Sequence, residues 1–221
     1  MNPFRLIGDM LHLISILLLL FKIKSDRSCA GISLKTQILF CVVFSTRYLD
    51  LFTSFIIISI YNTIMKVIYI YLSYSIVYYM MTKYKFTYDN EHDSFKIHYL
   101  IIPTALLAIL TYETPHENTY FNIFLEILWT FSVYLESVAI LPQLILLQRT
   151  GEVEAMTSNY IICLGGYRFF YFLNWIYRII YEDWTGKIVM LAGIVQTLLY
   201  CDFFYYYFQS KWYGSKLVLP H

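Results

Sequence analysis

Apolar segments long enough to cross a membrane recur along the whole chain, and only short polar stretches separate them. Seven segments hold the roughly 20 mostly apolar residues that a helix needs to cross a hydrocarbon core of about 30 Å, some of them with a few polar residues inside. This pattern predicts an all-α membrane protein with seven transmembrane helices. The segments run approximately over residues 4–21, 35–55, 61–82, 97–112, 120–147, 159–181 and 187–208.

The composition excludes most soluble classes of protein. Of the 221 residues, 59% are apolar and 14% are charged, whereas an ordinary soluble domain is roughly 45–50% apolar and about 25% charged. Too few charges remain to cover a water-facing surface. We therefore expect residues 1–208 to form a single transmembrane domain in a lipid bilayer, and residues 209–221 to form a short cytosolic tail.

Charge and cysteine content exclude further functions. The chain holds 16 Lys and Arg against 15 Asp and Glu, so it lacks the basic surface that a nucleic acid requires. Its four cysteines lie far apart without a CxxC pair, which argues against a disulfide framework or a metal site. No HExxH or GxGD motif occurs. We expect neither an enzyme nor a bound metal or cofactor.

The lysines and arginines of the polar stretches predict the orientation. If the stretch after the first segment is cytosolic, the other side keeps only Arg5 and Lys187 at segment ends, with Lys66 just inside a segment. Seven helices then place the N-terminus in the lumen and the C-terminus in the cytosol. The residues on the cytosolic side are Lys22, Lys24, Arg27, Lys35, Lys83, Lys85, Lys96, Arg149, Lys211 and Lys216.

Charged and polar residues also lie inside five of the predicted segments. A charge at the bilayer centre costs about 2.5–3.5 kcal/mol on insertion scales, so it needs a partner or a watery cavity. Structural ion pairs are one explanation, but the summed cost over five helices favours a ligand-binding cavity. Arg5, Asp9 and His12 share one helical face through their i, i+4, i+7 spacing. The others are Arg47, Asp50, Glu126, Trp129, Glu136, Tyr167, Arg168, Tyr171, Asn174, Trp175, Arg178 and Asp202.

The depths of these residues predict the chemistry of the ligand. Arg5, Arg47 and Arg178 all fall in the lumenal half of the predicted bilayer, and arginine binds carboxylates through two parallel hydrogen bonds. Asp50 and Glu126 lie at a similar depth and provide a site for a cation. The sequence therefore predicts a cavity that is open to the lumen and suits a short acidic group with a positive end.

His12 lies one to two helical turns deeper, together with Glu136 and Tyr167. Histidine, with an ordinary pKa near 6.5, is the side chain that changes charge between a neutral and a mildly acidic compartment. If an anionic ligand binds better when His12 is protonated, the affinity is greatest in acid. One coupled proton changes the affinity by at most about tenfold per pH unit.

Several stretches resemble the ER lumen protein-retaining receptor family, whose members bind C-terminal KDEL or HDEL retrieval signals. The likeness covers the whole chain and is dense in MNPFRLIGDMLHL, TRYLDLFTSF and WTFSVYLESVAILPQL. It implies seven helices, of which six form two three-helix bundles plus one linking helix, as in PQ-loop and sugar-transporter-like folds. Leu141-Pro142-Gln143 resembles the PQ element, where a proline kinks the helix and frees carbonyl groups.

The resemblance also implies a role for individual residues. Arg47 and Tyr48 bind the terminal carboxylate of the signal. Arg5 and Arg178 meet the acidic side chains of the signal, and Trp175 packs beside them. Independently of the resemblance, Tyr171 and Asn174 share a polar helical stripe with Tyr167 and Arg178 through their i, i+4, i+7, i+11 spacing, and we expect them to bind the ligand too. Asp50 and Glu126 face the basic residue four from the end, with Trp129 nearby. His12, Glu136, Tyr167 and Arg168 form a proton-sensitive lock that couples binding to a helix shift.

The function implied by the family is a cargo receptor that cycles between the ER and the cis-Golgi. Its partners are C-terminal K/HDEL peptides and, on the cytosolic side, the COPI coat, which is expected to contact Lys211 and Lys216 in the tail. The alternative is a small-solute transporter, for an anion or a sugar, on the same helical scaffold. A transporter needs polar groups that continue to the cytosolic side, and the sequence suggests few of them.

Overall fold

The computed structural model describes residues 2–53, 59–115, 119–151, 153–213 and 217, and all regular structure in these ranges is helical. The elements are α1 (Pro3–Ser25), α2 (Leu34–Arg47), α3 (Asp50–Thr53), α4 (Ile60–Tyr78), the π-helix η1 (Tyr79–Lys83), the 3₁₀ helix η2 (Lys85–Thr87), α5 (His98–Thr111), α6 (Tyr120–Val138), α7 (Leu141–Thr150), α8 (Ala155–Glu182) and α9 (Lys187–Tyr213).

Each of the seven predicted segments falls on helix, but two of them are not continuous helices. In the segment predicted over 35–55, α2 ends at Arg47, and Tyr48 leaves the helical conformation with φ −105° and ψ 26°. In the segment predicted over 120–147, a turn at residues 139 and 140 separates α6 from α7. Pro142 explains this second break, because a proline in the first turn of a helix cannot donate to the preceding turn.

Four helical stretches are long and apolar enough to cross a membrane, and they are Pro3–Ser25, Ile60–Lys83, Tyr120–Thr150 and Lys187–Ser210. α5 is apolar but has 14 residues, and α2 also has 14. α8 has 28 residues, which is ample length, but its polar stripe lowers its hydropathy. The regular structure of the described residues is therefore all helical and includes four candidate membrane spans, while the count of seven spans stays a prediction.

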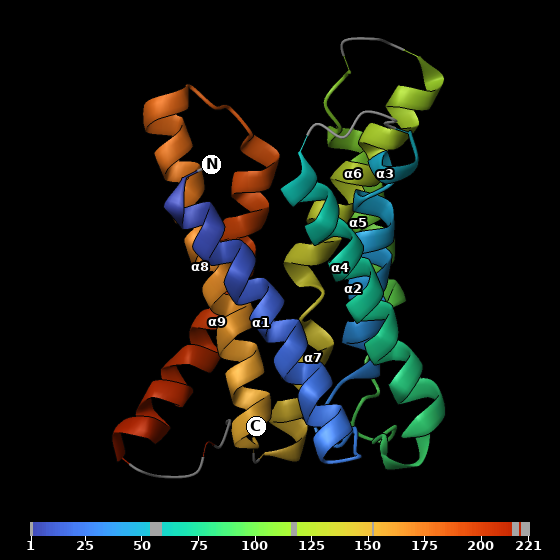
Figure 1. Cartoon of the computed structure of the whole chain (residues 1–221), viewed down its shortest axis with the longest axis vertical. Coiled ribbons are helices and arrows are strands. Elements are labelled where there is room, and N and C mark those ends of the chain that lie inside the picture. Colours follow the sequence, from blue (N-terminus) through green and yellow to red (C-terminus); the bar gives the residue numbers. More distant parts are fainter. Residues whose placement is uncertain (1, 54–58, 116–118, 152, 214–216, 218–221) are drawn as a thin grey trace.

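The helices pack in two groups (Figure 1). In the first group, α8 packs against both α1 and α9. The second group consists of α2, α4, α5 and α6. Contacts of α1 with α4 and of α6 with α9 join the two groups. Gly8 permits the close approach of α1 to α8, since a Cβ atom there would lie 2.7 Å from the ring of Tyr171. The predicted division into two three-helix bundles and a linking helix stays a prediction.

Large apolar side chains cover the outer faces of these helices. Leu110 of α5 is 79% exposed, and Ile64 and Val67 of α4 and Leu198 of α9 are also exposed. Apolar surfaces of this extent are unstable in water and fit a lipid environment. Several polar side chains are instead buried among the helices, and they are Asp9, His12, Glu136, Arg168 and Asn174.

α1 ends and α2 begins at the end of the molecule across from the start of α1, and we call this end the opposite face. A buried polar cluster stabilises the structure there. Gln143 of α7 accepts a hydrogen bond from the Ser33 amide at 2.8 Å and donates one to the Gly31 carbonyl at 2.8 Å. Ser33 caps α2 and donates at 2.9 Å to Asp93, which also accepts from Tyr88 at 2.6 Å. This cluster ties α7, α2 and the loop before α5 together.

Replacing Gln143 with Leu is expected to lower the free energy of unfolding by about 2–4 kcal/mol, because the Ser33 amide and the Gly31 carbonyl lose buried partners. Thermal unfolding of the purified protein in detergent measures this loss. Gln148→Leu is the matched control on the same helix, because the structure gives Gln148 no hydrogen bond to any residue it describes. Equal stability of the two variants would contradict the prediction.

Candidate binding site

A cavity of about 370 Å³ lies between the two groups of helices, toward the end at which α1 begins. Side chains from α1, α2, α4, α6, α8 and α9 line it. Five of these side chains are cationic, whereas two are carboxylates, Asp9 and Glu136. The five cations are Arg5, Arg47, Lys66, Arg168 and Arg178.

The structure gathers the residues singled out in the sequence around this cavity. Arg5, His12, Arg47, Tyr48, Trp129, Glu136, Tyr167, Arg168, Tyr171, Asn174, Trp175 and Arg178 line it. Asp50 and Glu126, the two remaining residues assigned to ligand binding, line a neighbouring cavity of about 340 Å³. Arg47, Tyr48, Lys66 and Trp129 line both cavities, so an arginine-rich space and an acid-containing space share a wall.

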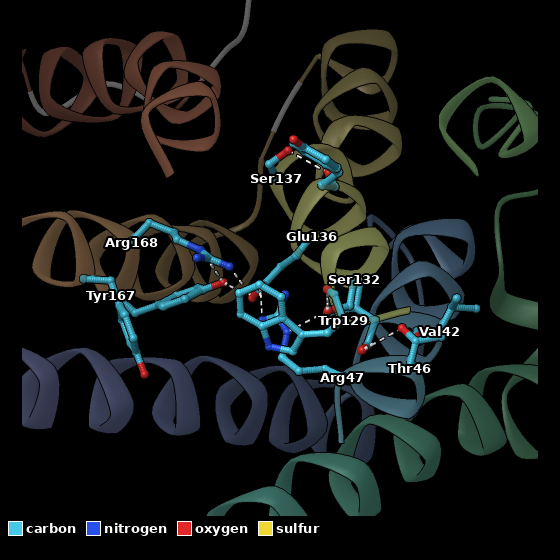
Figure 2. A network of polar contacts seen from close by, with 12 residues as sticks. Val42, Thr46, Arg47, Trp129, Ser132, Glu136, Ser137, Tyr167 and Arg168 are labelled. Atoms are coloured by element: carbon cyan, nitrogen blue, oxygen red, sulfur yellow. Dashed lines mark hydrogen bonds and ion pairs between the residues drawn. The ribbon is translucent and has the colours of Figure 1, made fainter. Parts of the chain in front are cut away.

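A charged network at the inner end of the larger cavity joins three helices (Figure 2). The Glu136 carboxylate of α6 pairs with Arg47 of α2 and with Arg168 of α8. It also accepts a hydrogen bond from the Tyr167 hydroxyl at 2.8 Å, and this hydroxyl accepts one from Arg168 Nε at 2.9 Å. Because two guanidiniums share one carboxylate, the network keeps a net positive charge.

The hydrogen-bonding capacity of the Arg47 guanidinium is only partly used by the described residues. Its Nε donates to Ser132 Oγ at 3.0 Å and its Nη1 pairs with Glu136. Its Nη2 is buried and has no hydrogen-bond partner among the residues that the structure describes. A buried guanidinium nitrogen without a partner costs free energy, which a ligand carboxylate in the cavity would recover.

His12 lies beside this network in a cage of aromatic rings. Its imidazole stacks on Tyr167 with 4.1 Å between ring centroids and an angle of 4° between planes, and it stacks on Tyr69 at 4.8 Å. The charged groups that face it come from three other helices, and they are Glu136, Arg47 and Arg168. The four residues assigned to a proton-sensitive lock are thus brought together.

No residue of α4 was predicted to bind the ligand, and Asp9 was given no role in binding, although both line the cavity. Tyr61, Asn62, Met65, Lys66 and Tyr69 line the cavity from one face of α4, and their helical spacing was the available signal. Asp9 accepts a hydrogen bond from Tyr61 at 2.9 Å and another from Tyr171, and it lies 4.0 Å from Arg5. The reason α4 was missed is that its residues, apart from Lys66, are uncharged.

Asp50 and Arg178, which are predicted to bind the ligand, also have charged partners within the chain. Asp50 pairs with Lys66, so it is not the open carboxylate that the sequence suggests. Arg178 pairs with Glu182 at 2.7 Å and lies 4.9 Å from the centre of the Trp184 ring. A ligand must therefore compete with both pairs.

The tail and one intramembrane acid lie outside this description. Lys216 and the side chains of Lys211 and Asp202 lie outside the part of the chain that the structure describes. Lys211 and Lys216 form the predicted coat contact. No group of three His, Cys, Asp or Glu side chains that could hold a metal occurs among the described residues.

Glu136→Gln is expected to lower the free energy of unfolding by about 3–5 kcal/mol, because Arg47 and Arg168 lose the buried carboxylate that both of them need. Glu182→Gln is the control: its pair with Arg178 is exposed, with Glu182 47% exposed, and its loss is expected to cost less than about 1 kcal/mol. Thermal unfolding in detergent compares them. A Glu136→Gln variant as stable as Glu182→Gln would contradict the central role of this carboxylate.

Comparison with known proteins agrees with the family resemblance of the sequence. A family model described as "ER lumen protein retaining receptor" matches residues 28–178. The chain is 64% identical to an ER lumen protein-retaining receptor of Dictyostelium discoideum over 220 residues, covering 100% of both chains. It is 54% identical, again over 220 residues and 100% of both chains, to relatives from Drosophila melanogaster and Homo sapiens, the latter named ER lumen protein-retaining receptor 2.

Proposed function

This chain belongs to the ER lumen protein-retaining receptor family and is a receptor rather than an enzyme, and from this premise we propose that it retrieves escaped ER proteins. It binds their C-terminal KDEL or HDEL signal in the acidic Golgi and releases them in the neutral ER. The observation that carries this proposal is the cavity in which five cations face two carboxylates. Such an excess of positive charge suits a ligand with several carboxylates.

The proposed binding mode places the acidic end of the peptide in the larger cavity. Arg47, through its unpartnered Nη2, and Tyr48 bind the terminal carboxylate. Arg5 and Arg178 bind the acidic side chains, with Trp175 packed beside them. The polar side chains of Tyr171 and Asn174 complete this wall of the cavity.

The basic residue of the signal goes to the neighbouring cavity in this binding mode. Glu126 and Asp50 line that cavity, and Trp129 lies on the wall shared with the larger one. The structure gives Glu126 no hydrogen bond or ion pair with any residue it describes, so its carboxylate can accept a ligand ammonium directly. The separation of the two charge types into adjacent cavities supports a ligand that is acidic at one end and basic a few residues before it.

The proposed pH switch is the protonation of His12. A proton on the imidazole adds a positive charge beside the Arg47–Glu136–Arg168 network, and a ligand that brings negative charge stabilises that protonated form. The affinity is then greatest at low pH and falls as the pH rises through the pKa of His12. Glu136, Tyr167 and Arg168 transmit the change, because they join α6 and α8 directly beside the imidazole ring.

The argument from sequence against a transporter needs a correction. Few polar groups were expected toward the cytosolic side, but Ser33, Asp93 and Gln143 are buried there. They are hydrogen-bonded to one another and to backbone groups, so they close that end instead of lining a path. Beyond His12, a third cavity has a volume of about 10 Å³, which is too small for any solute larger than water. These features favour a receptor.

The proposed topology follows the positive-inside rule. Seven spans place the N-terminus and the mouth of the larger cavity in the lumen, and the opposite face with the C-terminus in the cytosol. The receptor then cycles between ER and cis-Golgi membranes in COPI vesicles, with Lys211 and Lys216 of the tail as the proposed coat contact.

Arg47→Ala is expected to weaken binding of a KDEL-ending peptide by more than about a hundredfold, since a charge-assisted pair in a partly dry cavity is worth several kcal/mol. Calorimetry on the purified receptor at about pH 5.5 measures the affinity. Arg149→Ala, a change of an exposed arginine on the opposite face, is the control and should bind normally. A peptide with an amidated C-terminus should be weak on the wild type and no weaker on Arg47→Ala. Affinity of Arg47→Ala within threefold of wild type would contradict the carboxylate assignment.

His12→Phe is expected to keep the ring stack on Tyr167 but to lose the pH dependence of binding. The wild-type affinity for a KDEL-ending peptide should fall by up to about tenfold per pH unit between about pH 5.5 and about pH 7.5, whereas the variant should change little. His92→Phe, in the loop at the opposite face, keeps the wild-type slope as the control. A normal slope in His12→Phe would show that another group carries the proton.

A further inference from the structure

The ion pair between Lys66 and Asp50 connects the two cavities. Lys66 lies on α4 and Asp50 begins α3, and their side chains are 25% and 49% exposed. The Lys66 ammonium also lies 5.8 Å from the centre of the Tyr48 ring. It is therefore held at the wall that both cavities share, by a carboxylate on one side and an aromatic ring on the other.

The position of Lys66 is the one that a cationic ligand group would occupy. The acid-lined cavity contains two carboxylates, Asp50 and Glu126. One of them already holds the Lys66 ammonium, and the structure shows no partner for Glu126 among the residues it describes. A basic side chain that enters this cavity meets one free carboxylate and one whose charge is already balanced by the protein.

We propose that Lys66 is the resident cation of the acid-lined cavity and competes with the basic residue of the ligand for Asp50. This inference rests on the proposed function and adds a specificity-determining residue to it. The ligand's ammonium must displace Lys66 from Asp50, so at this carboxylate one ion pair replaces another. Lys66 thereby limits how strongly the receptor distinguishes a basic residue from a neutral one at that position.

The physical properties of the pair suit an exchange. An ion pair with this exposure is weak, and lysine carries its charge on a flexible four-carbon chain that can move away without disturbing the backbone. The displaced ammonium remains beside the cavity that holds the ligand's carboxylates, so its charge stays favourable to the ligand. Without Lys66, Asp50 would act on the ligand's base at full strength.

The test compares peptides that end in KDEL and ADEL, with binding measured on the full chain at about pH 5.5. The ratio of the two affinities isolates the contribution of the basic side chain. In Lys66→Gln this ratio should rise by about two- to fivefold over wild type, the size expected of one partly exposed ion pair. Lys66→Arg keeps the charge and should keep the wild-type ratio.

A double-mutant cycle separates pairing with Asp50 from a general change of charge. With Asp50→Asn already present, Lys66→Gln should leave the KDEL to ADEL ratio unchanged, because the carboxylate that Lys66 pairs with is gone. A rise of the same size in that background would overturn the inference, as would equal weakening of both peptides by Lys66→Gln with an unchanged ratio. If the wild-type protein binds neither peptide at about pH 5.5, the proposed function itself fails. A wild type that prefers KDEL with a ratio insensitive to Lys66→Gln overturns only the role of Lys66.

Discussion

The Glu136 carboxylate is the interaction on which the arrangement of this site depends. It lies within α6 and pairs with Arg47 at the end of α2 and with Arg168 within α8, so that one buried group holds three helices in register. Without it, two guanidiniums would be left without the carboxylate that they share, which is strongly destabilising in a buried site. The cavity keeps its positive charge because this single carboxylate cannot neutralise both partners.

Much of the fold and of the site could be predicted because both depend on properties of short segments. The length of each apolar run predicts a helix, and the 3.6-residue period places Tyr167, Tyr171, Asn174 and Arg178 on one stripe of α8, which lines the cavity. The cost of burying charge indicates that Arg5 and Arg47 need a shared environment, and they line one cavity. The break before α7 was also signalled, by Pro142.

The parts that could not be predicted depend on which side chains meet across the fold. Lys66 and Asp50 are charges on different elements, and nothing in their spacing indicates that they pair with each other instead of with a ligand. The hydrogen bonds from Gln143 to the region of Ser33 span more than a hundred residues of sequence. Residue type predicts that such groups need partners, but the identity of the partner follows only from the packing of the helices.

The shared carboxylate also explains why proton binding and ligand binding should strengthen each other. A ligand carboxylate on the free Nη2 of Arg47 adds negative charge to the Arg47–Glu136–Arg168 network. A proton on His12, which lies against Tyr167 and faces Glu136, adds a positive charge beside the same network and attracts that ligand. Because linkage is reciprocal, the ligand favours the protonated imidazole by the same factor by which the proton favours the ligand. In the proposed switch no separate sensor is needed, since the ligand and the proton would both change the charge balance around the group that holds these helices together.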